Sequence, residues 1–120
     1  MNDDSRENQV IDLDRALVRL GGSEEILRDL AALYLKEVPQ WMTRLEEAVL
    51  NQNDDEIFRL AHDLKGSTDI FAAPAAVRAA QELERMGRFG ELDGADEALG
   101  ALKAELVWVK TELRRYLAET

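Results

Sequence analysis

The fold is decided by a segment in the middle of the chain, which reads Asp55-Glu56-Ile57-Phe58-Arg59-Leu60-Ala61-His62-Asp63-Leu64-Lys65-Gly66-Ser67-Thr68-Asp69-Ile70-Phe71. On a helical wheel, at about 100° per residue, six of these residues form one stripe, with every member within about 60° of Ile57. The six are Ile57, Leu60, Ala61, Leu64, Thr68 and Phe71. His62 points about 140° away from Ile57, on the same side as Asp55, Gly66 and Asp69. The segment therefore predicts an amphipathic helix over about 54–71, with the only histidine of the chain facing solvent.

The same helical spacing continues on both sides of this segment. We expect further helices over about 12–20, from Ser23 to about 50, from Pro74 onward, and from Ala95 to Tyr116. Ser23 is predicted to cap the helix that follows it. Pro39 is expected to kink that helix or split it in two, because proline lacks a backbone N–H and crowds the preceding turn. The turn at 51–55 is expected to cap the next helix. The connection before the last helix is expected around Gly87, Gly90 and Gly94.

Each expected helix has an apolar stripe that can face a common core. These stripes are Ala16, Leu17 and Leu20; Ile26, Leu30, Leu33, Val38, Trp41, Leu45 and Ala48; Val77, Ala80, Leu83 and Met86; and Ala95, Leu99, Leu102, Leu106, Val109, Leu113 and Tyr116. Amphipathic helices joined by short turns pack as an up-and-down bundle. We therefore predict an all-α fold, an antiparallel up-and-down four-helix bundle with a short extra N-terminal helix. It is expected to occupy residues 10–118, after a frayed tail of residues 1–9.

The composition restricts the possible partners. Among 120 residues, 25 are acidic and 15 are basic, which gives a net charge of −10. Such a surface repels phosphate backbones and anionic lipid, so we expect neither nucleic acid nor a membrane as partner. No cysteine is present, which excludes disulfides and thiolate nucleophiles. The first residues are polar and lack the apolar core of a signal peptide, so the cytoplasm is the expected location. A monomer is the default expectation.

The solvent side of the central helix combines features that suit an anion. His62 supplies an imidazole, whose unperturbed pKa near 6.5 leaves a nucleophilic nitrogen at neutral pH. Lys65, three residues later, can reach a group attached to the ring. Gly66 costs about 1 kcal/mol in an exposed helix interior, and its missing side chain clears space beside the imidazole. Phe58, one turn before His62, adds apolar surface.

The residues alone leave a plainer interpretation open, in which His62 is an ordinary solvated side chain. Other chemistry is poorly supported. The glycine-rich segment 87–94 lacks the Gly-Lys-Ser/Thr of a phosphate-binding loop, so an ATP-dependent kinase is not expected. One histidine without cysteine offers too few ligands for zinc, and we expect no metal or cofactor site. A hydrolytic triad of His62 with Ser67 and Asp63 is disfavoured, because all three share one surface helix.

The segment Ala61-His62-Asp63-Leu64-Lys65-Gly66-Ser67-Thr68 resembles the signature of the histidine phosphotransfer (HPt) family of two-component phosphorelays. The resemblance extends over about residues 10–118. It includes Asp14 to Gly22, the proline-bearing stretch Tyr34 to Pro39, and Glu82-Leu83-Glu84 with Gly87 and Gly90.

The resemblance implies a four-helix bundle that exchanges a phosphoryl group with aspartates of receiver domains, in response regulators or hybrid sensor kinases. His62 is then the phosphorylated residue, and Lys65 stabilises the phosphoryl charge. Phe58, Arg59, Gly66 and Asp69 are expected to contact the receiver. The protein is expected to be a phosphocarrier without a kinase site of its own, with Mg²⁺ supplied by the receiver.

Two positions depart from the family pattern. Ala72 stands where the family usually has a second glycine, and Ala76 stands where a larger apolar residue is common. We expect these changes to affect fine geometry more than the role of His62. The alternative interpretation is a degenerate HPt-like adaptor that binds a partner without receiving phosphate.

Overall fold

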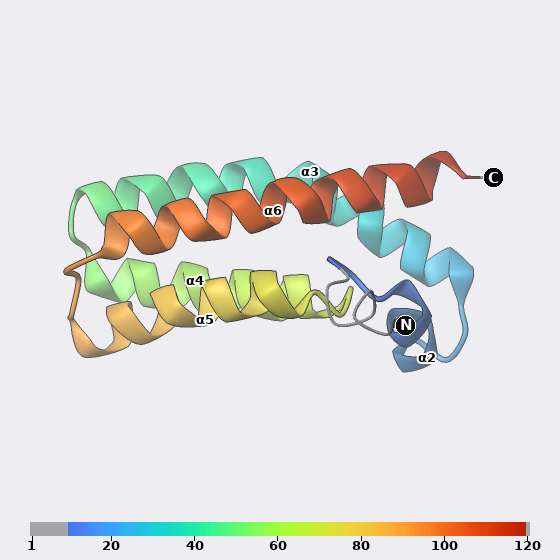
Figure 1. Cartoon of the computed structure of the whole chain (residues 1–120), viewed down its shortest axis with the longest axis horizontal. Helices are drawn as coiled ribbons and strands as arrows, with labels where there is room; N and C mark the ends of the chain where they lie inside the picture. The colour runs from blue at the N-terminus through green and yellow to red at the C-terminus, as the bar shows by residue number, and fades with distance from the viewer. Residues whose placement is uncertain (1–9, 120) are drawn as a thin grey trace, which may run out of the picture.

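The computed structural model describes residues 10–119 of the chain, and the tail predicted at residues 1–9 lies outside them. The described part contains five helices and no strand. They are α2 (Leu13–Arg19), α3 (Glu24–Leu50), α4 (Asp54–Asp69), α5 (Pro74–Phe89) and α6 (Ala95–Ala118). The four long helices run alternately up and down, with α3 and α6 in one layer and α4 and α5 in the other (Figure 1). The predicted four-helix bundle with a short extra helix is therefore confirmed.

The helices begin where the capping residues of the sequence place them. Ser23 Oγ accepts a hydrogen bond from the backbone N–H of Ile26 at 3.2 Å, as predicted for the start of α3. Asn53 Oδ1 accepts from the N–H of Glu56 at 3.2 Å and caps α4. Pro74 is the first residue of α5, where its missing N–H costs no helical hydrogen bond.

Of the two outcomes predicted for Pro39, a kink or a split, α3 shows no split. The helix continues from Glu24 to Leu50, and in Figure 1 its first half slants away from the direction of its second half, toward α2. Proline removes one hydrogen bond to the preceding turn. The helix is anchored in the core before and after Pro39, because Val38 and Leu45 are fully buried.

The buried face of α3 differs from the predicted stripe in its first half. Ile26 and Leu33 were predicted to be buried, but they are 47% and 48% exposed. The buried residues there are Leu27, Ala31 and Tyr34, a stripe shifted by one position, and the predicted stripe is buried again from Val38. The sequence allowed both stripes, because Ile26, Leu30 and Leu33 are each followed by another apolar residue. The observed stripe places Tyr34 inside, where its hydroxyl shares a 2.7 Å hydrogen bond with Thr68 Oγ1.

The predicted stripes of the other long helices are largely confirmed. In α6 all the predicted residues from Ala95 to Leu113 are buried, and Tyr116 is partly buried. In α5 only Val77 is less than fully buried, and Ala76 takes a place in the core. None of the helices within residues 10–119 has both the length and the apolar character needed to cross a bilayer.

Gly87 lies inside α5 and not in the connection where it was predicted. A Cβ atom at this position would lie 2.6 Å from the backbone nitrogen of Phe58 and 2.8 Å from the carbonyl oxygen of Asp54. Both atoms belong to the α4 backbone, which cannot move aside as a side chain can. Gly87 therefore allows the close packing of α4 and α5 that fixes the position of His62.

The turn between α4 and α5 is held by the N-terminal part of the chain. The N–H of Asp12 lies 3.1 Å from the carbonyl oxygens of both Phe71 and Ala72. Arg19 Nη1 donates to the carbonyl oxygen of Asp69 at 2.7 Å, at the end of α4. Within this turn Ala72 has φ +51°, a left-handed conformation that favours glycine. The departure from the family glycine therefore affects backbone conformation at a turn and not the packing of a helix.

Candidate functional site

His62 stands on the solvent side of α4, as the helical wheel predicted. Its side chain is 58% exposed. The ring of Phe58, one turn earlier, stacks beside the imidazole with the ring centroids 5.9 Å apart and the planes inclined by 21°. The stacking holds one face of the imidazole and leaves its outer edge in solvent.

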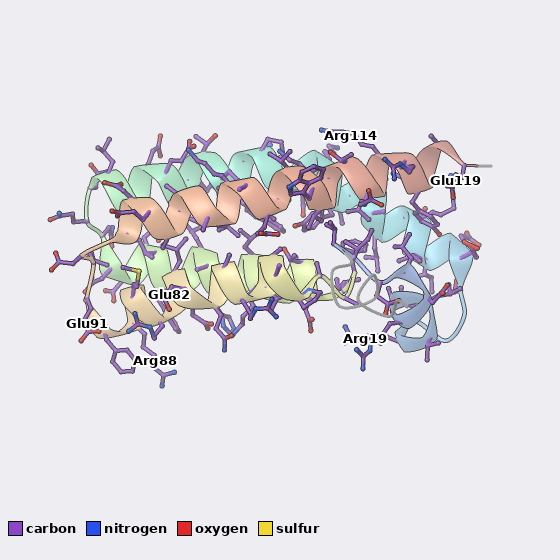
Figure 2. All side chains as sticks on the ribbon, viewed as in Figure 1. Arg19, Glu82, Arg88, Glu91, Arg114 and Glu119 are labelled. Carbon is purple, nitrogen blue, oxygen red and sulfur yellow. The ribbon has the colours of Figure 1, made fainter. Side chains whose placement is uncertain are left out.

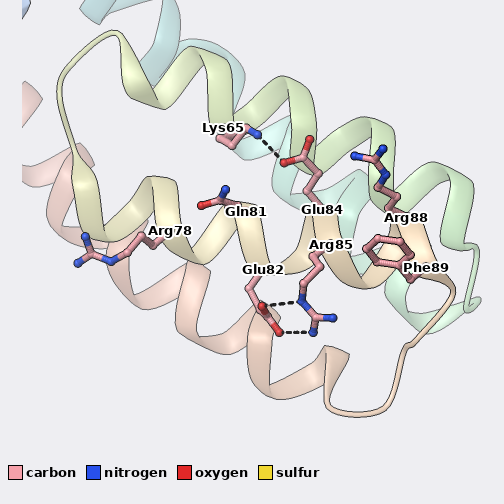
Figure 3. A pocket seen from close by; sticks show the side chains of 8 residues that line it. All are labelled: Lys65, Arg78, Gln81, Glu82, Glu84, Arg85, Arg88 and Phe89. Carbon is pink, nitrogen blue, oxygen red and sulfur yellow. Dashed lines mark hydrogen bonds and ion pairs between the residues drawn. The ribbon is translucent and has the colours of Figure 1, made fainter.

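The imidazole is tied to the neighbouring helix by Glu84 of α5. His62 Nδ1 lies 2.6 Å from Glu84 Oε2, and Lys65 Nζ donates to Glu84 Oε1 at 2.5 Å. Figure 3 shows the ammonium of Lys65 reaching from α4 to this carboxylate. The Glu84 side chain is only 13% exposed. His62, Glu84 and Lys65 therefore form one connected group across the α4–α5 groove.

The charge state of Glu84 defines the tautomer of the ring. Burial opposes its ionisation, but hydrogen bonds from Lys65 and His62 outweigh this effect, so the pKa of Glu84 lies below its ordinary value. Glu84 is therefore a carboxylate near neutral pH, and a carboxylate only accepts hydrogen bonds. The proton of a neutral His62 ring must then be on Nδ1. The lone pair is left on Nε2, at the free edge of the ring.

The space beside His62 is open at Gly66. A Cβ atom at Gly66 would have nothing within 4 Å beyond its chain neighbours and the backbone of its own helix, so no packing requirement explains a glycine there. A shallow groove runs past this glycine from His62 to Trp41 and Ile70. The structure therefore places the imidazole, the bare backbone and some apolar surface side by side, as the sequence predicted.

Arg59 and Asp69 are on the same outward side of α4 but do not belong to this group. Arg59 pairs with Glu56 at 2.5 Å, and Asp69 lies 3.7 Å from Arg19 at the end of the helix. Among the described residues, no hydrogen bond or ion pair joins either of them to His62. Their expected contacts with a receiver stay predictions.

Glu84 is the site residue that sequence reasoning missed. In the sequence it stands out only as part of Glu82-Leu83-Glu84, one acidic stretch among many. Its role depends on how α4 and α5 are aligned, which places it opposite both His62 and Lys65. The periodicity of a single helix carries no information about that alignment.

These features define the class of the protein: a helical bundle with one exposed imidazole that contacts a carboxylate of the neighbouring helix. The model of the Hpt domain matches residues 29–115, and the chain belongs to the Hpt domain family. Proteins of this family are phosphocarriers of two-component signalling that interact with receiver domains.

A solved structure has the same fold. The crystal structure of histidine-containing phosphotransfer protein B (HptB) from Pseudomonas aeruginosa PAO1 matches with a TM-score of 0.85 at 21% sequence identity. The match covers 94% of this chain and 98% of that one. A search of curated protein sequences found no significant relative.

Proposed function

We propose that His62 accepts a phosphoryl group from the aspartyl phosphate of a receiver domain and passes it to the aspartate of another receiver. The observation that supports this most directly is the hydrogen bond between His62 Nδ1 and Glu84. It leaves Nε2 as the nucleophile on the exposed edge of the ring. The same arrangement serves transfer in either direction.

In the forward step the Nε2 lone pair of His62 forms a bond to phosphorus. The bond between phosphorus and the aspartyl oxygen of the receiver breaks, and the aspartate leaves as a carboxylate. The ring keeps its proton on Nδ1 and so acquires positive charge. The Glu84 carboxylate, 2.6 Å from Nδ1, stabilises that charge, as the buried aspartate does for the imidazolium of a serine-protease triad. Glu84 is therefore a positioning residue.

Charge neutralisation is the other requirement of phosphoryl transfer. Lys65 is one turn after His62, and its ammonium donates a hydrogen bond to Glu84. A short movement of the Lys65 side chain brings the ammonium to a phosphoryl group on Nε2 of His62. We propose that the receiver supplies Mg²⁺ together with the reacting carboxylate. Phe58 and Gly66 then form the surface that the receiver approaches, and we place this exchange in the cytoplasm.

Transfer from labelled receivers tests the proposal. Receiver domains phosphorylated with labelled acetyl phosphate are mixed with this protein and Mg²⁺. We expect acid-labile label on the wild-type protein and none on His62→Gln. Equal labelling of His62→Gln rejects the proposal. Receiver binding without any label on the wild-type protein, unaffected by His62→Gln, supports the adaptor interpretation.

A further inference from the structure

The outward face of α5 carries a line of arginines beside the site. We define the arginine row as Arg78, Arg85 and Arg88. With Lys65 and Glu84 they line one groove, in which Figure 3 shows Arg78 toward one end and Arg88 toward the other. The row stands out because the whole chain has a net charge of −10.

The three arginines differ in how far their charge is already balanced. Arg85 is held by Glu82 at 2.7 Å and by Glu91 at 3.3 Å. Arg78 and Arg88 make no ion pair with a carboxylate of residues 10–119. Arg88 instead lies 5.8 Å from the ring centroid of Phe89, which is 64% exposed. Two positive charges and an exposed aromatic ring are thus available to a partner.

Arg78 and Arg88 stand on either side of the position of His62 along the bundle. Glu84, which contacts His62, follows Arg78 by six residues and precedes Arg88 by four. At a rise of about 1.5 Å per residue, these separations are about 9 Å and about 6 Å along α5. A protein large enough to cover the imidazole therefore also covers both arginines. The outward side of α4, by contrast, carries acidic side chains such as Asp55, Asp63 and Asp69, all exposed.

The partner in the proposed reaction has an anionic reacting face. Proteins hold Mg²⁺ with carboxylates, and a phosphoryl group adds about −1.5 to −2 charges at neutral pH. The acidic surface of this chain repels such a face, whereas positive charge beside the imidazole attracts it. Electrostatic complementarity of this kind raises association rates and fixes the orientation of docking.

We propose, on the basis of the proposed function, that Arg78 and Arg88 are docking residues that orient the carboxylate-rich face of the receiver toward α5. Phe89 supplies the apolar contact next to Arg88. The receiver that covers His62 and Gly66 of α4 then also extends over α5, where it meets both arginines. Its surface is expected to present acidic side chains to both arginines.

The test compares two double variants with equal changes of charge. Arg78→Glu/Arg88→Glu reverses the proposed docking residues. Arg44→Glu/Arg114→Glu makes the same change on α3 and α6, and Figure 2 shows Arg88 and Arg114 projecting from opposite sides of the molecule. The probe is the phosphorylated receiver that transfers fastest to the wild-type protein, measured with Mg²⁺ at low salt.

We expect Arg78→Glu/Arg88→Glu to accept phosphate at least about 10-fold more slowly than the control variant, because electrostatic steering changes association rates by about 10- to 1000-fold. The difference should shrink near 1 M salt, where the screening length falls to about 3 Å. Arg78→Gln/Arg88→Gln should show a smaller loss. Equal rates for the two double variants at low salt overturn the docking proposal.

Phosphoramidate, a small phosphoryl donor, separates this proposal from the proposed function. It reaches His62 without a docked receiver. Absence of label on the wild-type protein from both phosphoramidate and receivers rejects the proposed function. Label from both donors, with equal rates for the two double variants, rejects only the role of the arginines.

Discussion

Glu84 is the residue on which the proposed chemistry depends most after His62. Replacing it by glutamine keeps the size of the side chain and removes the charge that stabilises the phosphorylated ring. We expect Glu84→Gln to slow transfer from a phosphorylated receiver by roughly 100-fold, the lower end of the effect of general acid–base groups, because Glu84 holds the ring proton and does not transfer it. The measurement is the single-turnover rate of transfer. Glu47→Gln, which removes an exposed carboxylate on α3 away from the arginine row, is the control and should leave that rate within about twofold of the wild type.

The same carboxylate gives part of the fold stability a dependence on pH. The pKa of Glu84 in the fold lies below its ordinary value of 4.5. The bridge to Lys65 and His62 therefore stabilises the fold above the ordinary value, and this contribution is lost as pH falls through the lowered one. In urea unfolding, the stability difference between wild type and Glu84→Gln should shrink from pH 6 toward acid. A difference that grows toward acid contradicts this account.

Ala72 holds a backbone conformation that alanine adopts at a cost. Its φ of +51° lies in the left-handed region, where glycine avoids the steric penalty of a Cβ atom. We expect Ala72→Gly to raise the free energy of unfolding by about 0.5–1 kcal/mol. Ala73→Gly is the matched control, because Ala73 has φ −110° and is fully buried. Denaturant unfolding should show stabilisation by the first change and destabilisation by the second.

At the scale of the helices, Gly87 and Gly66 differ in what surrounds the missing side chain. Gly87 of α5 faces the α4 backbone, and Gly66 of α4 faces open space. We expect Gly87→Ala to destabilise the fold by about 1–3 kcal/mol, as overpacking does. Gly66→Ala should instead stabilise it by about 1 kcal/mol, the helix propensity gained. It should also slow transfer from receivers, because the added methyl group occupies the space the partner needs.

Thermal or urea unfolding measures the stability changes of Gly87→Ala and Gly66→Ala. Receiver-dependent labelling measures the effect of Gly66→Ala on transfer. If Gly66→Ala transferred phosphate at the wild-type rate, the glycine would have no role in docking. If Gly87→Ala left stability unchanged, the α4–α5 contact would not be the close backbone approach described above.

Helix positions could be predicted from the sequence because each helix carries its own apolar stripe and three of them carry a start signal. Ser23, the turn before α4 and Pro74 mark three helix starts, and α6 shows one unambiguous stripe. The first half of α3 was assigned to the wrong stripe, since two adjacent stripes are both apolar there. The structure resolved it through the pairing of Tyr34 with Thr68, a contact between two helices.

At the scale of the whole molecule, the site lies where two helices meet and not on one helix. The exposure of His62 and the open space at Gly66 could be predicted, because both depend only on the face of α4 they occupy. Glu84 and the arginine row could not, because they depend on the alignment of α5 against α4. Gly87 determines how closely those helices approach, and its importance follows only from its distance to the Phe58 backbone.

The bundle also shows how an acidic protein could receive the anionic partner proposed above. The net charge of −10 is spread over a surface whose arginine row lies next to the imidazole. Positively charged side chains therefore lie beside the site although the chain as a whole is negative.

The most direct test of the central claim is to locate the phosphorus atom on the phosphorylated protein. Nuclear magnetic resonance of a ¹⁵N-histidine-labelled sample, charged by phosphoramidate or by a receiver, reports ³¹P–¹⁵N coupling to each ring nitrogen. We predict coupling that identifies a bond to Nε2 of His62, with the proton retained on Nδ1. A phosphoryl group on Nδ1, or on any residue other than His62, would contradict the account.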